Sequence, residues 1–577
     1  MLKPKKSVEN MEGYYVPLFV SNWDIKIDSN ENNYGPSEKV IQALNCCNTS
    51  NISFYPFYGE LSQKIADLTG FKIDNIKLTN GADEAIQGII QTYIEDGDSI
   101  LTLDVSFDMP VIYGIIQNAS IIKVSFKEKW VFPIDSFLKE ISDNRIKLIY
   151  IATPNNPTGN VVSENDIRKI IEKAKDSAVI IDETYANYSQ ISYSKLVNEY
   201  DNVFIVKSFS KDFALAGMRL GYIISSSANI LNLKKVISPF SVNSYALKAG
   251  LAALDDINYL NYIRKEINDS KEELKTFFES IGAYVYTSHA NFLLVDFKDK
   301  AEYIYNKLLK NKISVKKFKK GSLLENHLRV TIPTKAGVER IKDILKLKRY
   351  LVFDMDGVLI NAANSYRLAI AETYKFYSKK TISQEEIQKV KNLGGLNNDW
   401  DLTKFLLDRD GINISYEDIV NTFQKIYWDN GKGLINNETP LFDLNLFDEL
   451  SKKYNLAIFT GRLRKEALFA LEKFNLENYF YPIITTDDIP SGKGKPDSFG
   501  LNLIKMSTIG KKYFYFGDTI DDMICAKNAG YLPIGVLPPQ DKSEELNLKL
   551  KLNGAEFVIN SINNINEILE KTNEAMC

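Results

Sequence analysis

The sequence predicts an α/β protein, because short apolar runs alternate with amphipathic helical patterns along the whole chain. Apolar runs that are bounded by turn residues and separated by helical segments are typical of parallel sheets with crossover helices. Many of these runs end in polar residues, and ligands of α/β proteins bind at the carboxyl ends of the strands. The runs occupy residues 146–152, 178–181, 203–206, 351–353, 456–459 and 513–516.

Composition is that of an ordinary globular protein. The chain has 577 residues, 45% of them hydrophobic and 25% charged, which suggests about four globular units of roughly 150 residues. A net charge of −3 gives no general attraction to nucleic acid or membranes, and no apolar run approaches the ~18 residues of a membrane span. The basic start at residues 1–6 has no signal-peptide core after it, and the four cysteines have neither a disulfide nor a zinc spacing. We therefore expect a reduced, cytoplasmic protein.

A domain boundary is predicted near residues 346–349. Helical periodicity runs over 337–347, and a strand of the buried type begins at Tyr350. We therefore expect one unit at residues 1–346 and a second at 349–577, joined by almost no linker.

Several segments of the first half carry candidate catalytic residues. Each alone has an ordinary structural explanation, since Asn, Pro and Gly favour turns, an acidic strand end can cap a helix, and most lysines lie on the surface. Together, and in this order, they match what an enzyme needs to use pyridoxal phosphate. The segments are NGADE at 80–84, PNNPTG at 154–159, DETY at 182–185, SFSK at 208–211 and AGMRLG at 216–221.

Pyridoxal phosphate needs an amine, a carboxylate and hydrogen-bond donors around its ring. Lys211 is the candidate to form an imine with its aldehyde, and Asp182 is the candidate to keep the pyridine nitrogen protonated. Asn156 and Tyr185 are candidate donors to the ring phenolate. The phosphate needs a cup of hydroxyls, backbone amides at a helix start and a cation. We predict that the cup consists of Ser208, Ser210, Arg219 and the amides of Ala82 and Asp83.

Residues 13–345 resemble the fold-type I aminotransferases of class I and II, in particular the histidinol-phosphate aminotransferase group. The resemblance implies a large and a small domain, pyridoxal phosphate as the cofactor, and Lys211 as the carrier of a proton between the α-carbon of the substrate and the cofactor. Beyond the segments named above, it rests on YVP at 15–17, NENNYGPS at 30–37, YPFYG at 55–59 and HLRVTIPT at 327–334.

The resemblance also implies roles for residues that spacing alone does not single out. Phe107 is expected to stack on the cofactor ring, and Tyr15 to contact the substrate. Tyr55 is expected to reach the cofactor phosphate of a neighbouring subunit, which implies a homodimer. Arg329 is expected to bind the α-carboxylate of an amino donor such as glutamate.

Two positions depart from the family pattern. Pro110 stands where the family has an aromatic residue, and Lys316 stands where it has an arginine for the terminal phosphate of the substrate. Lysine binds phosphate as a point charge, without the planar fork of arginine. Lys316 lies in a basic cluster over 310–320, whose other members we interpret as a solvated face. We expect a phosphorylated amino acceptor, of which imidazoleacetol phosphate is one candidate.

The second half begins with LVFDMDGVL at 351–359, in which an apolar strand leads to Asp354 and Asp356. A helix cap or a calcium loop has similar residues, but a calcium loop needs more oxygen ligands, and none follow. Together with three later segments, this motif resembles the ordered motifs of the haloacid dehalogenase superfamily, over residues 350–568. The later segments are FTGR at 459–462, KGKPD at 493–497 and FGDTIDD at 516–522.

This second resemblance implies a Rossmann-like core and a phosphatase with an aspartate nucleophile. Asp354 is expected to attack phosphorus, and Asp356 to protonate the leaving alcohol and later to activate water. The phosphoryl group is expected to be held by Thr460, Gly461 and Lys495.

Magnesium is the implied metal, because an anionic nucleophile otherwise has to approach an anionic phosphate. The expected ligands are Asp354, the backbone carbonyl of Asp356, and Asp518. Asp522 is expected to orient a metal-bound water or the lysine of the third motif, with Asp521 as the alternative.

Residues 364–455, between the first two motifs, show helical patterns, and they resemble the helical cap of the β-phosphoglucomutase-like subgroup. Caps close over small substrates and exclude water. The cap contains GGLNNDWDL at 394–402. One interpretation is a helix N-cap at Asn398 or Asp399, with Trp400 in the core. The other is that Asn397, Asn398 and Trp400 face the substrate.

The predicted function is two consecutive steps: transamination of a phosphorylated keto compound with glutamate, then magnesium-dependent removal of phosphate from the amino alcohol phosphate. Fusion raises the local concentration of the first product at the second site. Histidine biosynthesis has steps of this kind. The alternatives are dihydroxyacetone phosphate as acceptor, which gives an amino diol, decarboxylation of a phosphorylated amino acid, and a non-catalytic role for one half. Intact Lys211 and Asp354 argue against the last of these.

Overall fold

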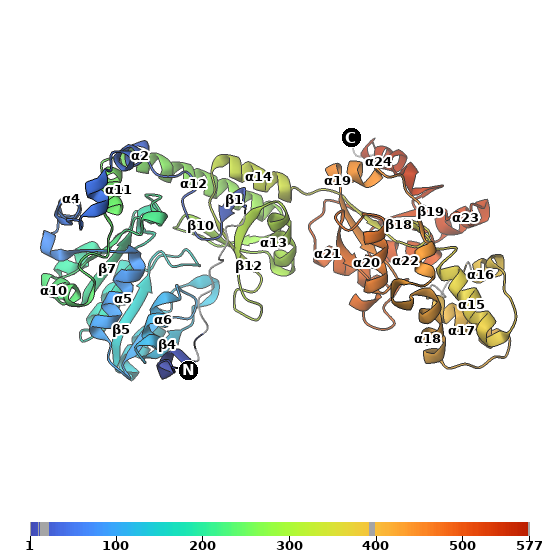
Figure 1. Cartoon of the computed structure of the whole chain (residues 1–577), viewed down its shortest axis with the longest axis horizontal. Coiled ribbons are helices and arrows are strands. Elements are labelled where there is room, and N and C mark those ends of the chain that lie inside the picture. Colours follow the sequence, from blue (N-terminus) through green and yellow to red (C-terminus); the bar gives the residue numbers. More distant parts are fainter. Residues whose placement is uncertain (1, 10, 12–21, 392–397, 575–577) are drawn as a thin grey trace. The chain divides into compact units, whose positions relative to one another are not determined.

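The computed structural model describes residues 2–9, 11, 22–391 and 398–574. The chain forms two compact units, Met1–Leu345 and Lys346–Cys577 (Figure 1). In the described part of the chain, no helix is long and apolar enough to cross a membrane. Each unit contains a mainly parallel sheet of the kind that the apolar runs predict.

The larger sheet of the first unit has the strand order β2-β8-β7-β6-β5-β3-β4. Neighbouring strands are parallel except for β8, which is antiparallel to β2 and β7. The runs predicted at 146–152, 178–181 and 203–206 are confirmed as strands. The strands are β2 (Ile76–Thr79), β3 (Ser99–Leu103), β4 (Ser120–Val124), β5 (Ile146–Ala152), β6 (Ala178–Asp182), β7 (Val203–Ser208) and β8 (Gly221–Ile224).

Helices cover both faces of this sheet, because its strands bury apolar side chains on both sides. One face packs against α4, α7, α8 and α11, and the other against α5 and α10. The carboxyl ends of β5, β6 and β7 lead directly into the PNNPTG, DETY and SFSK segments. The helices are α4 (Gly59–Thr69), α5 (Gly81–Tyr93), α7 (Ile134–Asp143), α8 (Glu164–Lys173), α10 (Ser227–Val236) and α11 (Ser244–Leu254).

The smaller sheet of the first unit has the order β1-β11-β12-β10-β9. Its register places Lys316 opposite Arg329, so both side chains lie on the same face. The strands are β1 (Ile25–Ile27), β9 (Tyr284–Val285), β10 (Phe292–Asp296), β11 (Ile313–Lys317) and β12 (His327–Thr331). The helices α12 (Ile257–Ser280) and α13 (Ala301–Lys310) contact this sheet, and α14 (Lys335–Leu345) packs on both.

The core of the second unit is a parallel sheet with the order β17-β16-β13-β18-β19-β20. Asp354, Thr460 and Asp518 each follow directly after one of its three adjacent strands β13, β16 and β18, at the same edge. The strands are β13 (Tyr350–Phe353), β16 (Asn455–Phe459), β17 (Phe480–Ile484), β18 (Tyr513–Gly517), β19 (Leu532–Val536) and β20 (Phe557–Ile559). The helices of this core are α19 (Leu446–Lys453), α20 (Arg464–Lys473), α21 (Phe499–Met506), α22 (Ile520–Asn528), α23 (Glu544–Leu552) and α24 (Ile565–Glu574).

A separate group of helices between β13 and β16 forms a cap with its own hydrophobic core. These helices are α15 (Tyr366–Ser378), α16 (Gln384–Lys391), α17 (Asp399–Arg409) and α18 (Tyr416–Tyr427). By contrast, α19 belongs to the core of the sheet, where Phe447 packs against Phe353. The helices of the cap therefore end before α19, whereas the sequence interpretation extended the cap to residue 455.

Candidate active sites

The site of the first unit centres on Lys211, in the loop after β7. Its Nζ donates a hydrogen bond to the backbone carbonyl of Ser29 at 2.8 Å. Burial and the nearby Arg329 guanidinium lower the pKa of Lys211 to about 8. A lysine with this pKa has a large neutral fraction at mildly alkaline pH, and the neutral amine is the form that reacts with an aldehyde.

Asp182, the last residue of β6, is a buried carboxylate with a fixed orientation. One of its oxygens accepts a hydrogen bond from the Tyr150 hydroxyl at 2.7 Å. The other accepts from the backbone amide and the hydroxyl of Thr184, at 3.0 and 2.6 Å. Burial raises the pKa of Asp182 although these bonds oppose it. Such a carboxylate suits a cationic partner like a protonated pyridine nitrogen.

Residues of both sheets of the first unit meet beside these groups. On β12, Arg329 donates to the side-chain oxygen of Asn156 at 2.6 Å, and also to the backbone carbonyl of Asp28. The side-chain amide of Asn30 donates to the Tyr185 hydroxyl at 2.9 Å. The structure therefore brings together Arg329 and Asn156, which the sequence analysis assigned to different ligands.

Asn30 belongs to this site, although the sequence analysis gave it no role. It is buried, and it exchanges hydrogen bonds of 3.0 and 3.1 Å with the Thr331 hydroxyl. Its φ of +57° is a conformation that asparagine adopts more readily than most residues. The NENNYGPS segment was the signal, but its partners Tyr185 and Thr331 are far away along the chain, so spacing did not reveal the contacts.

The predicted phosphate cup lies where Arg219 meets the start of α5. Arg219 pairs with the Asp83 carboxylate at 2.8 Å, and the Ser208 hydroxyl accepts from the backbone amide of Ser210 at 3.1 Å. Gly81 has a φ of +76°, and a Cβ atom there would lie 2.7 Å from the Arg219 guanidinium. Because Gly81 has no side chain, the Arg219 guanidinium can approach the first backbone amides of α5, including those of Ala82 and Asp83. A cation beside backbone amides at a helix start is the arrangement that binds a phosphate group.

The other predicted residues of the first unit are more peripheral. Phe107 is partly buried against the core beneath α5. Tyr55 is 74% exposed and stacks on Phe240, with ring centroids 4.4 Å apart. Lys316 is exposed and lies opposite Arg329 on the neighbouring strand. Tyr15 lies outside the described residues.

In the second unit, Lys495 lies between two aspartates. Its Nζ is 2.8 Å from Asp354 and 2.8 Å from Asp522. Burial raises the pKa of Asp354 to about 7, although Lys495 acts in the opposite direction. The contact between Asp522 and Lys495 is consistent with an orienting role for Asp522.

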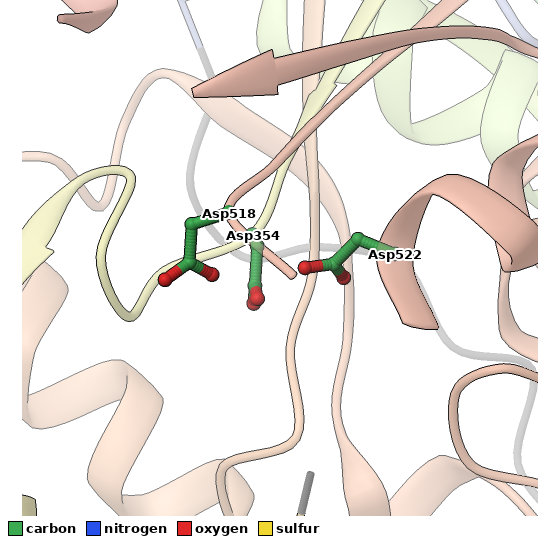
Figure 2. Close-up of side chains that lie close together, drawn as sticks. All are labelled: Asp354, Asp518 and Asp522. Atoms are coloured by element: carbon green, nitrogen blue, oxygen red, sulfur yellow. The ribbon is translucent and has the colours of Figure 1, made fainter. Parts of the chain in front are cut away.

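Asp354, Asp518 and Asp522 form a cluster in which one carboxylate oxygen of each residue lies within 4.8 Å of those of the other two. Figure 2 shows Asp518 and Asp354 side by side, with Asp522 pointing toward Asp354 from the start of α22. Gly357 has a φ of +75°, and a Cβ atom there would lie 2.1 Å from the Asp518 carboxylate. The donors are oxygens, which are the ligands that Mg²⁺ prefers.

Family models match both units of the chain. A family model described as "Aminotransferase class I and II" matches residues 24–345, and one described as "Haloacid dehalogenase-like hydrolase" matches residues 351–536. The chain belongs to the first family, and its second unit contains a haloacid dehalogenase-like hydrolase domain. We call the two units the aminotransferase unit and the hydrolase unit. Membership of the first family implies pyridoxal phosphate as the cofactor, and the donor set described above fits it.

The relatives and solved structures resemble the aminotransferase unit. "Histidinol-phosphate aminotransferase" of Thermoanaerobacter sp. (strain X514) is 33% identical over 334 residues, which are 57% of this chain and 92% of that protein. The protein of the same name from Methanosarcina mazei is 36% identical over 323 residues, which are 55% of this chain and 86% of that protein. The crystal structure of the histidinol-phosphate aminotransferase from Clostridium acetobutylicum has a TM-score of 0.52 at 24% identity, covering 56% of this chain and 98% of that one. This structure supports the fold alone.

A buried arginine in the hydrolase unit holds Asp356. The Arg462 guanidinium donates to both oxygens of Asp356, at 2.6 and 3.0 Å. It also donates to both oxygens of Glu438, at 2.9 and 3.0 Å. Glu438 in turn accepts from Ser365 and Tyr427 of the cap, each at 3.0 Å. The FTGR motif was the sequence signal for Arg462, whereas Glu438 had none.

The backbone around the second motif is also hydrogen-bonded. Thr460 is fully buried, and its amide donates to the carbonyl of Ile484 at 3.0 Å. The carbonyl of Gly461 accepts from the Thr486 hydroxyl at 2.6 Å. A loop held in this way can present Thr460 to a phosphoryl group without rearrangement.

The GGLNNDWDL segment begins α17. The Asn398 side chain accepts from the backbone amide of Trp400 at 2.9 Å, which is N-cap geometry. Trp400 is partly buried against the core of the cap. The predicted N-cap is therefore confirmed, and Asn397 lies outside the described residues.

Proposed function

We propose that the chain transaminates a phosphorylated keto compound with glutamate, and then hydrolyses the phosphate monoester that results. The observation that carries this proposal is that one chain holds Lys211, which donates to a backbone carbonyl and has a pKa lowered to about 8, and also Asp354, whose carboxylate pairs with Lys495. The relatives named after histidinol phosphate support a phosphorylated acceptor for the first step. Histidinol phosphate is accordingly the first product to test.

In the aminotransferase unit, the surroundings of four residues suit them to separate roles in transamination. When bound, pyridoxal phosphate supplies an electron sink for the bond changes at the α-carbon. Lys211 Nζ moves the proton to and from that carbon, and the Asp182 carboxylate would pair with the protonated ring nitrogen of the cofactor. Arg329 binds the α-carboxylate of the donor, and Lys316, on the same sheet face, attracts the phosphate of the acceptor.

In the hydrolase unit, the proposed reaction has two displacements at phosphorus. An Asp354 oxygen bonds to phosphorus while the bond to the alcohol oxygen breaks, and Asp356 gives that oxygen a proton. Water then attacks phosphorus, passes a proton to Asp356, and releases phosphate from Asp354. Lys495 and Thr460 hold the phosphoryl oxygens. Asp354, Asp518 and the Asp356 carbonyl would hold Mg²⁺, which would supply positive charge to offset that of the phosphate and the nucleophile.

We also propose that the aminotransferase unit forms a homodimer. Tyr55 and Phe240 are exposed aromatic residues that stack on each other, and together with Phe54 and Phe57 they leave apolar surface open. Light scattering on the full chain tests this proposal, and a monomer at micromolar concentration contradicts it.

A panel of keto phosphates tests the function. Imidazoleacetol phosphate and dihydroxyacetone phosphate are each incubated with glutamate and Mg²⁺, and 2-oxoglutarate and phosphate are measured together. The proposal expects 2-oxoglutarate first, and then phosphate in equal final amount. The Lys211→Ala chain is the control, because it should form neither product from the keto phosphate. Release of carbon dioxide from a phosphorylated amino acid without formation of 2-oxoglutarate would indicate a decarboxylase instead.

A further inference from the structure

Arg367, on the first turn of α15, is a buried arginine that the proposed reaction does not use. It is 7% exposed, and its NH1 has no hydrogen-bond partner among the residues that the structure describes. An unpaired buried donor costs free energy that a bound acceptor can recover. In this respect Arg367 differs from Arg462, which is paired with carboxylates on both sides.

The start of α15 rests on the catalytic core. The Ser365 hydroxyl donates to Glu438 at 3.0 Å, and the Arg462 guanidinium lies 5.3 Å from the centre of the Tyr366 ring. Arg367 follows these two residues directly and therefore lies at the junction of cap and core.

The charges around Arg367 come from the catalytic loops and from the cap. Burial lowers the pKa of Arg367, and the carboxylates of Asp518 and Asp356 are among the groups that oppose this. The carboxylates of Asp541, after β19, and of Asp399, in α17, also act to raise the pKa of Arg367. Asp356 is the proposed proton donor to the leaving alcohol, so Arg367 is near enough to that group for their charges to interact.

We propose that Arg367 is a substrate-binding residue that donates hydrogen bonds to an oxygen of the leaving alcohol, either a hydroxyl or a carboxylate, close to the phosphate ester. The inference rests on the proposed phosphatase activity and narrows its substrate class. It favours the amino diol phosphate formed from dihydroxyacetone phosphate over histidinol phosphate, which has no such oxygen. A hydrogen bond from a charged donor to such an oxygen is among the stronger ones in proteins. A leaving group that brings only an ammonium group to this position is repelled by the guanidinium.

Three phosphate monoesters distinguish a hydroxyl, a carboxylate and neither at this position, because all three have the same 2-aminoethyl phosphate skeleton. Phosphoethanolamine, serinol phosphate and O-phosphoserine carry hydrogen, hydroxymethyl and carboxylate on the carbon that bears the amine. The kcat/KM values are measured with the full chain and Mg²⁺. Binding of the same compounds is measured by calorimetry on the Asp354→Asn chain, which should not turn them over.

We expect serinol phosphate or O-phosphoserine to be preferred over phosphoethanolamine, and the better of the two identifies the oxygen as hydroxyl or carboxylate. Arg367→Met should lower kcat/KM and affinity for the preferred compound by on the order of tenfold to a hundredfold. The values for phosphoethanolamine should change far less. Arg409→Met, at an exposed arginine of the cap, is the matched control and should leave all three unchanged.

Two outcomes overturn the role of Arg367. One is an equal loss for all three compounds in Arg367→Met, which indicates a purely structural role. The other is an absence of preference among the three compounds, either in hydrolysis by the unchanged chain or in binding to the Asp354→Asn chain. A chain that binds them with the expected preference but releases no phosphate contradicts only the phosphatase proposal, whereas a chain that binds none of them contradicts both.

Discussion

The two active sites each contain a partly buried lysine, and the pKa values of the two lysines are shifted in opposite directions. Lys211 of the aminotransferase unit donates to a backbone carbonyl, and burial lowers its pKa to about 8. Burial also lowers the pKa of Lys495 in the hydrolase unit, but the carboxylates of Asp354 and Asp522 more than reverse this and raise it. The same side chain is thus a base in one site and a permanent cation in the other.

The hydrogen-bond or ion-pair partner of each lysine therefore decides its charge state more than its burial does. A neutral amine can exchange a proton with a carbon atom, which is what transamination needs. A permanently charged lysine can stabilise phosphoryl oxygens and a carboxylate nucleophile, which is what phosphoryl transfer needs. Each of the following predictions tests one part of this contrast.

The largest effects are expected from removal of the reacting groups themselves. Lys211→Ala should lower transamination by a factor on the order of 10³ or more, and Asp354→Asn should do the same to hydrolysis of a phosphate monoester. Each variant should retain the other activity, because the reacting groups belong to separate compact units. Both activities are assayed on each full-length variant, and loss of both from either change contradicts two independent sites.

The next effect is expected at Arg462 of the hydrolase unit. Arg462→Met removes the cation that pairs with buried Glu438. It also removes the guanidinium that holds the Asp356 carboxylate in place. Breaking a buried ion pair from one side costs about 3–5 kcal/mol of unfolding free energy, measured by urea denaturation of the full chain. Loss of orientation at Asp356 should lower kcat for hydrolysis by roughly 10²-fold.

A second variant separates these two effects. Adding Glu438→Gln to Arg462→Met removes the unpaired charge, so it should restore part of the stability. It should not restore kcat, because Asp356 still lacks its partner. Recovery of kcat in the double variant would contradict a positioning role for Arg462.

Each site also places a glycine of positive φ against a charged group, and these glycines should be intolerant of a methyl group. Gly81→Ala should displace Arg219 and weaken binding of pyridoxal phosphate, and Gly357→Ala should displace Asp518 and raise the Mg²⁺ concentration needed for hydrolysis. Forced overlap in packed sites costs about 1–3 kcal/mol, so each affinity should fall roughly tenfold or more. Both are measured by titration of the purified variants.

Two glycines without a positive φ serve as controls for these two variants. Gly217 and Gly494 lie in the motif loops of the two sites, and a Cβ atom at either would meet nothing within 4 Å. Gly217→Ala and Gly494→Ala should therefore keep the affinities close to those of the unchanged chain. Equal losses at all four positions would argue against the close contacts as the cause.

The low pKa of Lys211 predicts a pH dependence that Lys495 does not share. The folded chain disfavours the protonated amine, so the apoprotein should gain stability as pH rises from about 8 to 10.5, where the unfolded chain binds more protons. The rate at which the apoprotein forms its cofactor absorbance band should rise with a midpoint near pH 8. Arg329→Met should move this midpoint upward, because Arg329 helps to lower the pKa. An unchanged midpoint contradicts this cause.

The smallest effects are expected where the two sites are alike. In both, a buried tyrosine donates to a buried aspartate: Tyr150 to Asp182 at 2.7 Å, and Tyr515 to Asp522 at 3.0 Å. Each Tyr→Phe change should lower the unfolding free energy of its own unit by about 1 kcal/mol in urea. Tyr262→Phe, at an exposed tyrosine, is the control and should have no effect. A loss in the opposite unit would contradict separate folding units.

Much of the two sites could be predicted because parallel strands place their carboxyl ends at one edge. The motifs that follow β5, β6 and β7, and those that follow β13, β16 and β18, therefore had to meet. What could not be predicted comes from partners that are distant in sequence. Asn30 contacts Thr331 across 301 positions, and Arg462 contacts Asp356 across 106.

The sequence by itself determined the two chemistries, because an amine with its carboxylate and an aspartate nucleophile with its lysine are specified by residue type and order. Only the tertiary structure decided how these groups behave. Burial and the distance to neighbouring charges set the pKa values of Lys211 and Lys495, and neither quantity can be read from a motif. The same holds for Arg367, whose burial on the first turn of α15 cannot be read from a motif either.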